Sequence, residues 1–522
     1  MNMMNEPVAP MDGASPAYER IAVEFRLDGE VISGYADETI IQTADRLGVS
    51  IPRLCYKPGM RPDGNCRACM VEVKGERVLA ASCCRTPTPG MEVTSNSDRA
   101  RISQNMVLEL LLSDMPETDY TRHSELDRWA AELNVGKPRF SGADLRRPQP
   151  SADLTHHAIA VNLDACIQCT RCVRACREVQ VNDVIGFAFR GEASKIVFDQ
   201  DDPMGESTCV ACGECVQACP TGALMPARNA ALVVPDKQVH SVCPYCGVGC
   251  QLTYNIRDNK ILYVNGRDGP ANHERLCVKG RYGFDYVHHR HRLTKPLIRR
   301  EGVSKTADFR MDPDNVDQVF REATWDEALD LAASKLRAIR DRTDRANGDG
   351  SGPRALAGFG SAKGSNEEAY LFQKLVRTGF GSNNVDHCTR LCHASSVVAL
   401  LEGIGSGAVS NQVNDVLRAD VIFLIGANPV VNHPVAATWI KNAVKNGTRL
   451  ILADPRRSEL ARHATHYLQF NADTDVALLN AMMHTIVDEN LVDEEFIASR
   501  TIGYEELRAN VAGYSPEAMA PV

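Results

Sequence analysis

The chain has 522 residues, of which 44% are hydrophobic and 6% aromatic, and its formal net charge is -9. This length is enough for several domains, each with its own core. The acidic balance argues against nucleic acid as the main partner, and no apolar run is long enough to predict a membrane span. Residues 1–19 lack the pattern of an export signal, so we expect a disordered lead and a cytoplasmic location.

Nineteen cysteines are the main functional signal in the sequence. Their odd number, their tight local clustering and the missing secretion signal all argue against a disulfide scaffold. The sequence therefore predicts reduced thiols that bind metal.

Two cysteine runs share the spacing C-x2-C-x2-C-x3-C, which is typical of bacterial ferredoxins. In such pairs the fourth cysteine of each run binds the cluster of the other run. One 4Fe–4S cluster should therefore use Cys166, Cys169, Cys172 and Cys219, and the other should use Cys209, Cys212, Cys215 and Cys176. Pro220 follows the second run as the pattern expects, whereas Arg177 replaces proline after the first. Structural zinc is the alternative, but zinc prefers two separated C-x2-C knuckles.

An earlier set of cysteines has the spacing C-x10-C-x2-C-x13-C and consists of Cys55, Cys66, Cys69 and Cys83. The segment before it, residues 21–56, alternates like two short strands and then becomes helical. This order predicts a β-grasp ferredoxin domain with a 2Fe–2S cluster, although plant-type ferredoxins use another spacing. We expect Cys83 to be the ligand and its neighbour Cys84 a bystander, and zinc remains the alternative metal.

The last set of cysteines lies in VCPYCGVGC and, further on, in LCVKG. A C-x2-C-x3-C group with a distant fourth cysteine predicts a third 4Fe–4S cluster. Its ligands are Cys243, Cys246, Cys250 and Cys277.

The chain from about residue 355 alternates apolar strands with helical periods, which predicts a parallel α/β sheet. A strand should start at Arg354, and Val421–Gly426 reads as a buried parallel strand. Ligands bind beyond the carboxyl ends of such strands. The candidates there are Gly426, Asn428, His433, Asp454 and Arg456. Asp454 can bind a guanine or ribose edge and Arg456 a diphosphate, but Asp454 can also be part of a plain turn and His433 only a helix cap.

The motifs CPYCGVGC, CVKG and LTKPLIRR resemble those of the molybdopterin oxidoreductases. The segment from FGSAKGSNEE to RLCHASSV resembles the metal-site region of formate dehydrogenases. The resemblance implies that Cys392 binds molybdenum or tungsten, held by two pterin guanine dinucleotides, and that His393 steers a proton. It also implies that Lys279 lies between a cubane and the pterin. Lys279 can instead be a surface residue, and we expect Cys388 to be a core residue.

The N-terminal clusters resemble those of the large iron–sulfur subunit of complex I. Together the motifs are similar to the α subunit of cytosolic NAD-linked formate dehydrogenases. The resemblance implies reversible oxidation of formate to carbon dioxide, with electrons passing to a flavin- and NAD-binding diaphorase subunit. A non-catalytic electron-transfer subunit and another molybdopterin reductase, such as nitrate reductase, are the alternatives.

Two departures from this resemblance affect the expectation. Close relatives carry a further His-x3-Cys-x2-Cys-x5-Cys cluster, but no cysteine lies between Cys84 and Cys166, so His123 should be a surface histidine. The pterin domains are expected to be incomplete at the C-terminus, with the formate-binding arginine outside this chain.

The predicted fold class is a multidomain α+β and α/β protein. The order is a disordered lead (1–19), a β-grasp 2Fe–2S domain (20–100), a helical linker without ligands (101–155), a double 4Fe–4S ferredoxin domain (156–235), a 4Fe–4S domain (236–300) and truncated molybdopterin-binding α/β domains (301–522).

Overall fold

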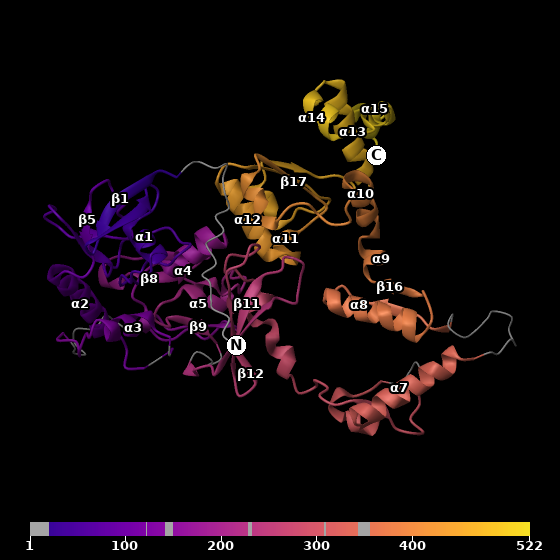
Figure 1. Ribbon diagram of the computed structural model, residues 1–522, viewed down its shortest axis with the longest axis horizontal. Helices are drawn as coiled ribbons and strands as arrows, with labels where there is room; N and C mark the ends of the chain where they lie inside the picture. The colour runs from indigo at the N-terminus through magenta and orange to yellow at the C-terminus, as the bar shows by residue number, and fades with distance from the viewer. Residues whose placement is uncertain are drawn as a thin grey trace.

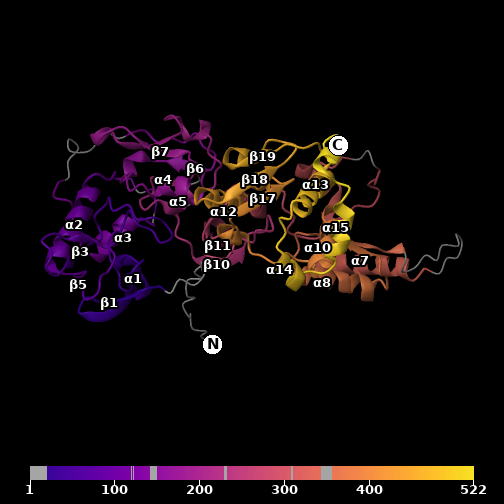
Figure 2. The same ribbon diagram turned by 90° about the horizontal axis from the view of Figure 1, so that it is seen from above.

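The computed structural model describes residues 20–118, 120–121, 123–140, 150–227, 232–306, 310–342 and 355–522. The expected disordered lead and the expected strand start at Arg354 lie outside these residues. Figure 1 shows the described residues up to Gly266 gathered in one mass, with the helix α12 (Pro434–Lys445) against it, whereas the helices within residues 325–404 and 475–511 extend away from it. In the view from above, α12 lies between this mass and the C-terminal helices (Figure 2).

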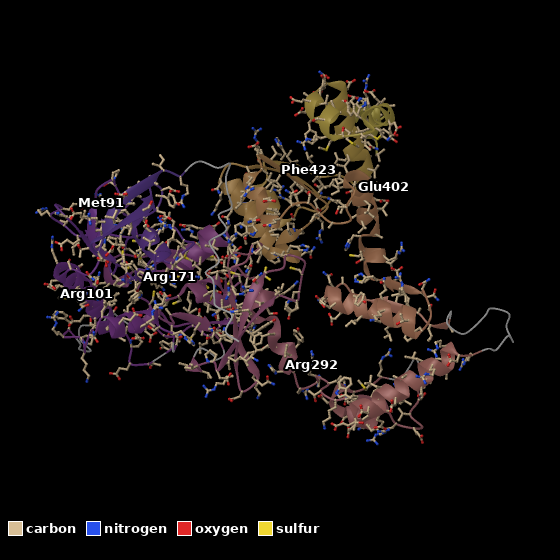
Figure 3. All side chains as sticks on the ribbon, viewed as in Figure 1. Met91, Arg101, Arg171, Arg292, Glu402 and Phe423 are labelled. Carbon is tan, nitrogen blue, oxygen red and sulfur yellow. The ribbon has the colours of Figure 1, made fainter. Side chains whose placement is uncertain are left out.

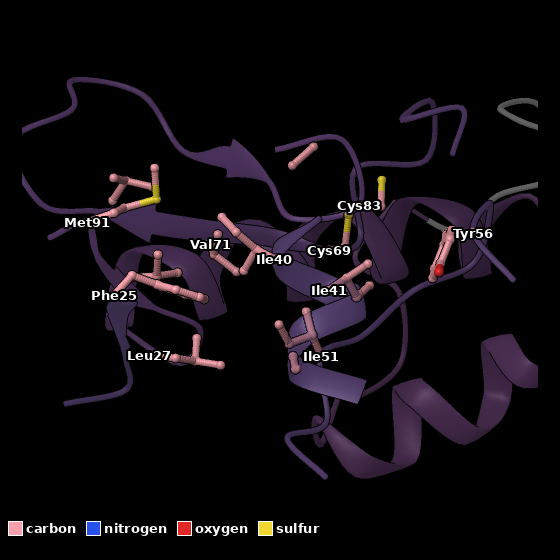
Figure 4. Close-up of a cluster of buried hydrophobic side chains, with 14 residues drawn as sticks. Phe25, Leu27, Ile40, Ile41, Ile51, Tyr56, Cys69, Val71, Cys83 and Met91 are labelled. Carbon is pink, nitrogen blue, oxygen red and sulfur yellow. The ribbon is translucent and has the colours of Figure 1, made fainter. Parts of the chain in front are cut away.

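The first domain is a mixed five-stranded sheet in the order β2-β1-β5-β3-β4, with β1 and β5 parallel. Its elements are β1 (Ala22–Leu27), β2 (Glu30–Tyr35), α1 (Ile40–Arg46), β3 (Met70–Val73), β4 (Ala80–Ala81) and β5 (Glu92–Thr94). Alternate residues of β1 point inward, so Phe25 and Leu27 pack against Ile40 and Ile41 of α1 (Figure 4). This is the arrangement expected of a β-grasp domain.

Two helices follow as the predicted linker, α2 (Asp98–Ser113) and α3 (Glu125–Glu132). Ser97 and Ser124 cap them, because each serine side chain accepts a hydrogen bond from the backbone amide of the third residue of its helix. Leu108 and Trp129 pack with Leu54 of the first domain, so the linker is fixed to the loop that carries Cys55.

The ferredoxin domain is built from two short two-stranded sheets and the helices that lie between their strands. Its elements are β6 (Ile159–Val161), α4 (Arg171–Arg174), the π-helix η3 (Ala175–Val179), β7 (Ile185–Ala188), β8 (Lys195–Phe198), α5 (Glu214–Ala218) and β9 (Leu224–Pro226). Strand β6 pairs with β9 and β7 with β8, both antiparallel. The helices α4 and α5 each lie within one of the two cysteine runs.

The third cysteine set lies on a three-stranded antiparallel sheet followed by a short helix. Its elements are β10 (Lys237–Val242), β11 (Gln251–Arg257), β12 (Lys260–Gly266), α6 (Val278–Tyr282) and the 3-10 helix η7 (Gly283–His288). Leu252 and Val264 of this sheet pack with Val435 of α12, so the core of this domain continues into the C-terminal part.

The C-terminal part contains the predicted parallel pairing in two separate sheets. The first group is β13 (Leu297–Arg299), β14 (Phe320–Glu322), α7 (Trp325–Arg340), β15 (Gly358–Gly360), α8 (Asn366–Lys374), the π-helix η11 (Leu375–Gly379), β16 (Val385–His387), α9 (Thr389–Cys392) and α10 (Ala394–Ile404). The second is β17 (Val421–Ile425), α11 (Pro429–Asn432), α12 (Pro434–Lys445), β18 (Arg449–Ala453), β19 (His466–Leu468), α13 (Asp475–Asp488), α14 (Glu494–Arg500), α15 (Tyr504–Val511) and α16 (Pro516–Met519). Strands β15 and β16 are parallel, as are β17, β18 and β19.

One expectation about this part was wrong. Strand β17 is not buried on both faces, because Val421 is 48% and Phe423 37% exposed (Phe423 is labelled in Figure 3). Only one face of β17 packs against α12. The segment from Asn428 to His433 contains the short helix α11, since Pro429 at its first position presets the helical φ.

Among the described residues, no helix is long and apolar enough to cross a membrane.

Candidate functional site

The four thiols predicted for the 2Fe–2S cluster converge at the edge of the first domain. Cys55 forms side-chain hydrogen bonds with Cys66 and Cys83, and Cys69 forms one with Cys83. These contacts lower the pKa of Cys55 to about 2 and raise the pKa of Cys66. Cys83 is fully buried and close to Cys69 in Figure 4, whereas Cys84 is exposed although its Sγ lies 3.5 Å from that of Cys83. The geometry therefore favours Cys83 over Cys84 as the ligand.

The ferredoxin domain brings its eight thiols together in the two predicted crossed groups. Cys166, Cys169, Cys172 and Cys219 line one small cavity, together with Pro220. The thiol of Cys176, from the first run, interacts electrostatically with Cys209, Cys212 and Cys215 of the second. The fourth cysteine of each run thus lies with the other group, as crossed cluster binding requires.

The two cysteine runs have the same backbone conformation. Gln168 and Ala211 have φ values of 55° and 53°, and Thr170 and Gly213 have φ values of 60° and 71°. These left-handed residues turn the loop inward, so the amides of Gln168 and Ala211 each donate to the cysteine Sγ two residues earlier, both at 3.4 Å. Such N–H···S bonds are one way in which a protein tunes a cluster.

The third group of thiols lies beside the C-terminal part. Cys243, Cys246, Cys250 and Cys277 line a cavity that also includes Asn432, Pro434 and Val435. Lys279 lines the same cavity, although its side chain is exposed overall. The predicted position of Lys279 at the border between a cubane and the pterin part therefore fits the structure, and its role stays a prediction.

Burial and mutual repulsion make these thiols hard to ionise without a cation. Burial, and after it the charge of neighbouring thiolates, raise the pKa of Cys169 and Cys250 to about 12. Burial, and after it the charge of Glu214, raise the pKa of Cys212 to about 12. Bound iron would offset both costs. In the described part of the chain, no three His, Cys, Asp or Glu side chains are close enough to bind one metal ion. A cubane differs from such a site because each thiolate binds its own iron.

The predicted pterin-binding residues of the second sheet lie together beyond β17 and β18. The Gly426 amide donates to the Ala453 carbonyl at 2.9 Å, and the Arg456 amide donates to Asp454 Oδ1 at 2.7 Å. Asn428 Nδ2 donates to Glu459 at 3.2 Å, whereas its Oδ1 is buried without a hydrogen-bond partner among the described residues. The orphaned oxygen and the φ of +58° at Gly426 fit a site for a polar ligand.

The structure does not support every expectation in this region. His433 stands at the N-cap position of α12, but its exposed side chain makes no capping hydrogen bond. The alternative that His433 only caps the helix is therefore not supported by a side-chain contact. Asp454 does hold a turn, through the bond to Arg456, so a purely structural role for it stays open. Cys388 is exposed, so the expectation of a core cysteine was wrong.

The physical reason for the exposure of Cys388 is that its surroundings form no core. Helices α8, α9 and α10 bury no residue, and Leu391 is 96% exposed. Cys392 and His393 are exposed on the same segment. Within the described ranges, no side-chain hydrogen bond connects either residue to the segment from Gly426 to His433, which contains α11, so no such contact links these two parts of the predicted site.

Four protein families match successive parts of the chain. Residues 20–98 match the 2Fe-2S iron-sulfur cluster binding domain, and residues 157–225 match the ferredoxin-like domain of NADH-quinone oxidoreductase subunit 3. Residues 236–289 match the molybdopterin oxidoreductase Fe4S4 domain, and residues 292–512 match molybdopterin oxidoreductase itself. Taken in order, these matches make the chain similar to the iron–sulfur and molybdopterin domains of molybdopterin oxidoreductases. The predicted fold class, with its cluster and molybdopterin domains in this order, is thereby confirmed, and the predicted domain boundaries stay predictions.

Curated relatives of this chain include proteins named for formate chemistry. "Probable oxidoreductase YjgC" from Bacillus subtilis is 30% identical over 94% of this chain and 52% of its own length. "Putative formate dehydrogenase SH0748" from Staphylococcus haemolyticus is 31% identical over 87% of this chain and 48% of its own length. The chain spans about half the length of the curated relatives it matches. An NAD+-reducing [NiFe]-hydrogenase structure is similar over 41% of this chain and 90% of its own, with 28% identity and a TM-score of 0.38.

Sequence patterns missed the charged residues that join the cysteine groups. Arg281, 3% exposed, donates from Nε to the Cys212 carbonyl at 2.7 Å and forms an ion pair with Glu214. Glu214 also accepts from the Leu276 amide at 3.0 Å, next to Cys277. Arg174 bonds to the backbone of two other cysteines. The sequence offered only one sign of these contacts, an arginine close to a cysteine run. This sign is not specific, because Arg177 also lies next to such a run and is exposed.

Proposed function

We propose that this chain is the α subunit, or part of it, of a formate dehydrogenase that transfers electrons from formate to a partner subunit. The observation that carries the proposal is the sequence of contacts between the thiol groups. The cavity of the Cys243 group is also lined by residues of α12 in the pterin part. Arg281, close to Cys277 of that group, donates a hydrogen bond to the Cys212 carbonyl. Arg174 donates to the carbonyls of both Cys169 and Cys55. These junctions give a continuous order from the pterin part to the 2Fe–2S domain.

The proposed groups are one 2Fe–2S cluster, three 4Fe–4S clusters and a molybdenum or tungsten bis-molybdopterin guanine dinucleotide. When bound, the pterin centre supplies the two-electron oxidation of formate to carbon dioxide and a proton, and the clusters supply single-electron carriers. Cysteine thiolates of the four described groups would hold the iron. Cys392 would hold the molybdenum or tungsten, and His393 beside it would take up or release the proton.

The residues of the second sheet would hold the pterin nucleotides. Gly426 and Asn428 offer a backbone turn and an unpartnered oxygen, while Asp454 and Arg456 offer an acidic and a basic group beyond the next strand. Lys279, as a cation between Cys277 and the pterin part, would stabilise added electron density on either side. Formate specificity and these individual roles are proposals, supported by the names of the relatives and by the Cys392-His393 pair.

The proposed electron acceptor is a flavin- and NAD-binding diaphorase subunit that docks near the 2Fe–2S domain. Its support is the match of residues 157–225 to a domain of NADH-quinone oxidoreductase. The cytoplasmic location stays a prediction.

Metal analysis combined with formate titration tests the proposal. The protein purified with its natural partners should contain molybdenum or tungsten, and anaerobic formate should bleach its iron–sulfur absorption. Cys392→Ser should abolish the bleaching and leave the iron content unchanged. Clusters that are reduced by dithionite but never by formate would contradict the proposal. In that case, reoxidation by nitrate would favour a nitrate reductase, and no reaction would favour a non-catalytic subunit.

A further inference from the structure

The 2Fe–2S domain and the first ferredoxin group meet at one guanidinium, that of Arg174 in α4. Its Nη2 donates to the carbonyl oxygens of Cys55 at 2.5 Å and Cys169 at 3.3 Å. Its Nη1 donates to the carbonyl of Arg61, in the loop that follows Cys55. One nitrogen thus bonds to a predicted ligand of each of two different clusters.

Arg174 is buried without a compensating charge. It is 3% exposed, and in the part of the chain that the structure describes it forms no ion pair with a carboxylate. Its Nε has no hydrogen-bond partner among these residues. Arginine stays protonated in proteins. An uncompensated buried charge costs several kcal/mol, so a compensating negative charge is expected nearby. Iron–sulfur clusters held by cysteine thiolates on both sides are the natural source.

The neighbouring Arg171 is a buried arginine at the same interface whose charge is paired with a carboxylate. It is 1% exposed and lies inside the N-terminal mass in Figure 3. It donates to the Leu54 carbonyl at 3.1 Å and forms a two-pronged ion pair with Glu125, at 2.8 and 2.9 Å. Its charge is therefore compensated by a carboxylate. Since Arg171 already joins the two domains, docking alone does not explain a second, unpaired buried arginine.

We propose that Arg174 is a positioning residue for electron exchange between the Cys55 cluster and the Cys166 cluster. The hydrogen bonds of its guanidinium group hold the two ligand loops at a fixed distance from each other. Its positive charge stabilises the reduced state of both clusters. An electron that leaves one cluster, which is thereby oxidised, then reduces the other without a change in geometry. This inference rests on the proposed electron relay but needs no formate chemistry.

Potentiometric titration of the cluster-loaded protein, followed by electron paramagnetic resonance, tests this role. Arg174→Gln should shift the midpoint potentials of the 2Fe–2S cluster and the first cubane to more negative values, and leave that of the Cys243 cluster unchanged. Electron exchange between the two clusters, measured after a one-electron pulse, should slow on the order of tenfold. Arg174→Lys keeps the charge but loses the fork, so it should restore the potentials and leave the exchange slow.

Two control variants separate this role from simple loosening of the interface. Arg177→Gln removes an exposed charge three residues away and should change neither quantity. The double variant R171Q/E125Q removes the neighbouring ion pair without changing the net charge. It should leave the 2Fe–2S potential in place and shift that of the first cubane less than Arg174→Gln does, because Arg171 also interacts with the thiols of Cys169 and Cys219.

Unchanged potentials and an unchanged exchange rate in Arg174→Gln, at full iron content, would overturn the proposal. Equal shifts in R171Q/E125Q would overturn it as well. If Arg174→Gln fails to bind iron, Arg174→Lys decides, and an exchange rate equal to that of the unmodified protein would refute the positioning role. The titration uses dye mediators, so a protein that does not oxidise formate can still be tested.

Discussion

Lys441 of α12 joins the pterin part to Gln180 of the ferredoxin domain, with its Nζ 2.8 Å from the Gln180 carbonyl oxygen. The same Nζ also donates to the Val181 carbonyl and to Asn182 Oδ1, both at 3.0 Å. Lys441 is 6% exposed, and burial lowers its pKa to about 8. Three acceptors of one domain thus depend on a single side chain of the other.

Lys441→Met should weaken this contact. Methionine has a similar length but no donor, so the buried carbonyls of Gln180 and Val181 lose their partner, at a cost of about 1–3 kcal/mol. Urea denaturation should show a lower midpoint for the transition of the C-terminal part. Lys445→Met is the matched control: its exposed Nζ bonds to the Arg177 carbonyl at 2.6 Å, and its loss should cost less than about 0.5 kcal/mol. Equal losses in both variants would contradict this account of the contact.

The buried ion pair between Arg281 and Glu214 should be costly to break on one side. The side chains are 3% and 7% exposed, so Arg281→Met leaves an unpaired buried carboxylate and should cost about 3–5 kcal/mol in unfolding free energy. The double variant R281M/E214Q removes both charges and keeps an acceptor for the Leu276 amide, so it should be the more stable of the two. Chemical denaturation measures both, and the reverse order would contradict the buried-charge argument.

Paired cysteine substitutions test the crossing of the two ferredoxin runs. Cys176 lies in the first run by sequence but with Cys209 in the structure. Cys176→Ala combined with Cys209→Ala should therefore remove one cubane and leave about ten irons per chain. Cys176→Ala combined with Cys166→Ala should remove two and leave about six. Iron and sulfide analysis distinguishes the outcomes, and the opposite pattern would show that each run holds its own cluster.

His156 should make the ferredoxin domain sensitive to acid. Its Nδ1 accepts from the amides of Ala158 at 3.1 Å and Ile159 at 3.2 Å, which only a neutral imidazole can do at that nitrogen. Burial, and then the nearby His157, lower the pKa of His156 below its usual 6.5. The unfolded chain therefore binds its proton first as the pH falls. The resulting stability is present above pH 6.5 and is lost as the pH falls below it.

His156→Asn keeps an oxygen acceptor but does not titrate. Its unfolding free energy, followed by circular dichroism between pH 7.5 and 5.5 (about one unit on either side of the ordinary histidine pKa), should fall less steeply than that of the unmodified protein. Iron content must be monitored in parallel. Identical slopes would show that His156 does not contribute.

The sequence predicted the thiol groups because ligand spacing is local and follows from cluster geometry. Even the crossing of Cys176 and Cys219 follows from the repeated run. The contacts of Arg281, Arg174 and Lys441 could not be predicted, because these side chains reach backbone carbonyls that lie 69, 113 and 261 positions away. Backbone acceptors carry no residue-type signature, so no pattern marks them.

The errors lie where local pattern and long-range packing disagree. Cys388 was expected in a core because isolated cysteines are usually buried, but the segment around it packs against little of the described chain. Val421 lies in an apolar run that predicts a strand buried on both faces, but whether both faces are covered depends on helices elsewhere. The strand itself and its parallel pairing were predicted correctly.

The iron bound per chain tests the four-cluster relay most directly. Three 4Fe–4S clusters and one 2Fe–2S cluster require about fourteen irons. Anaerobically purified protein analysed for iron, acid-labile sulfide and protein by amino-acid analysis should give that number. About eighteen irons per chain would reveal a further cluster that these cysteine groups do not explain. About four irons per chain, with zinc bound where the other clusters are expected, would contradict the relay.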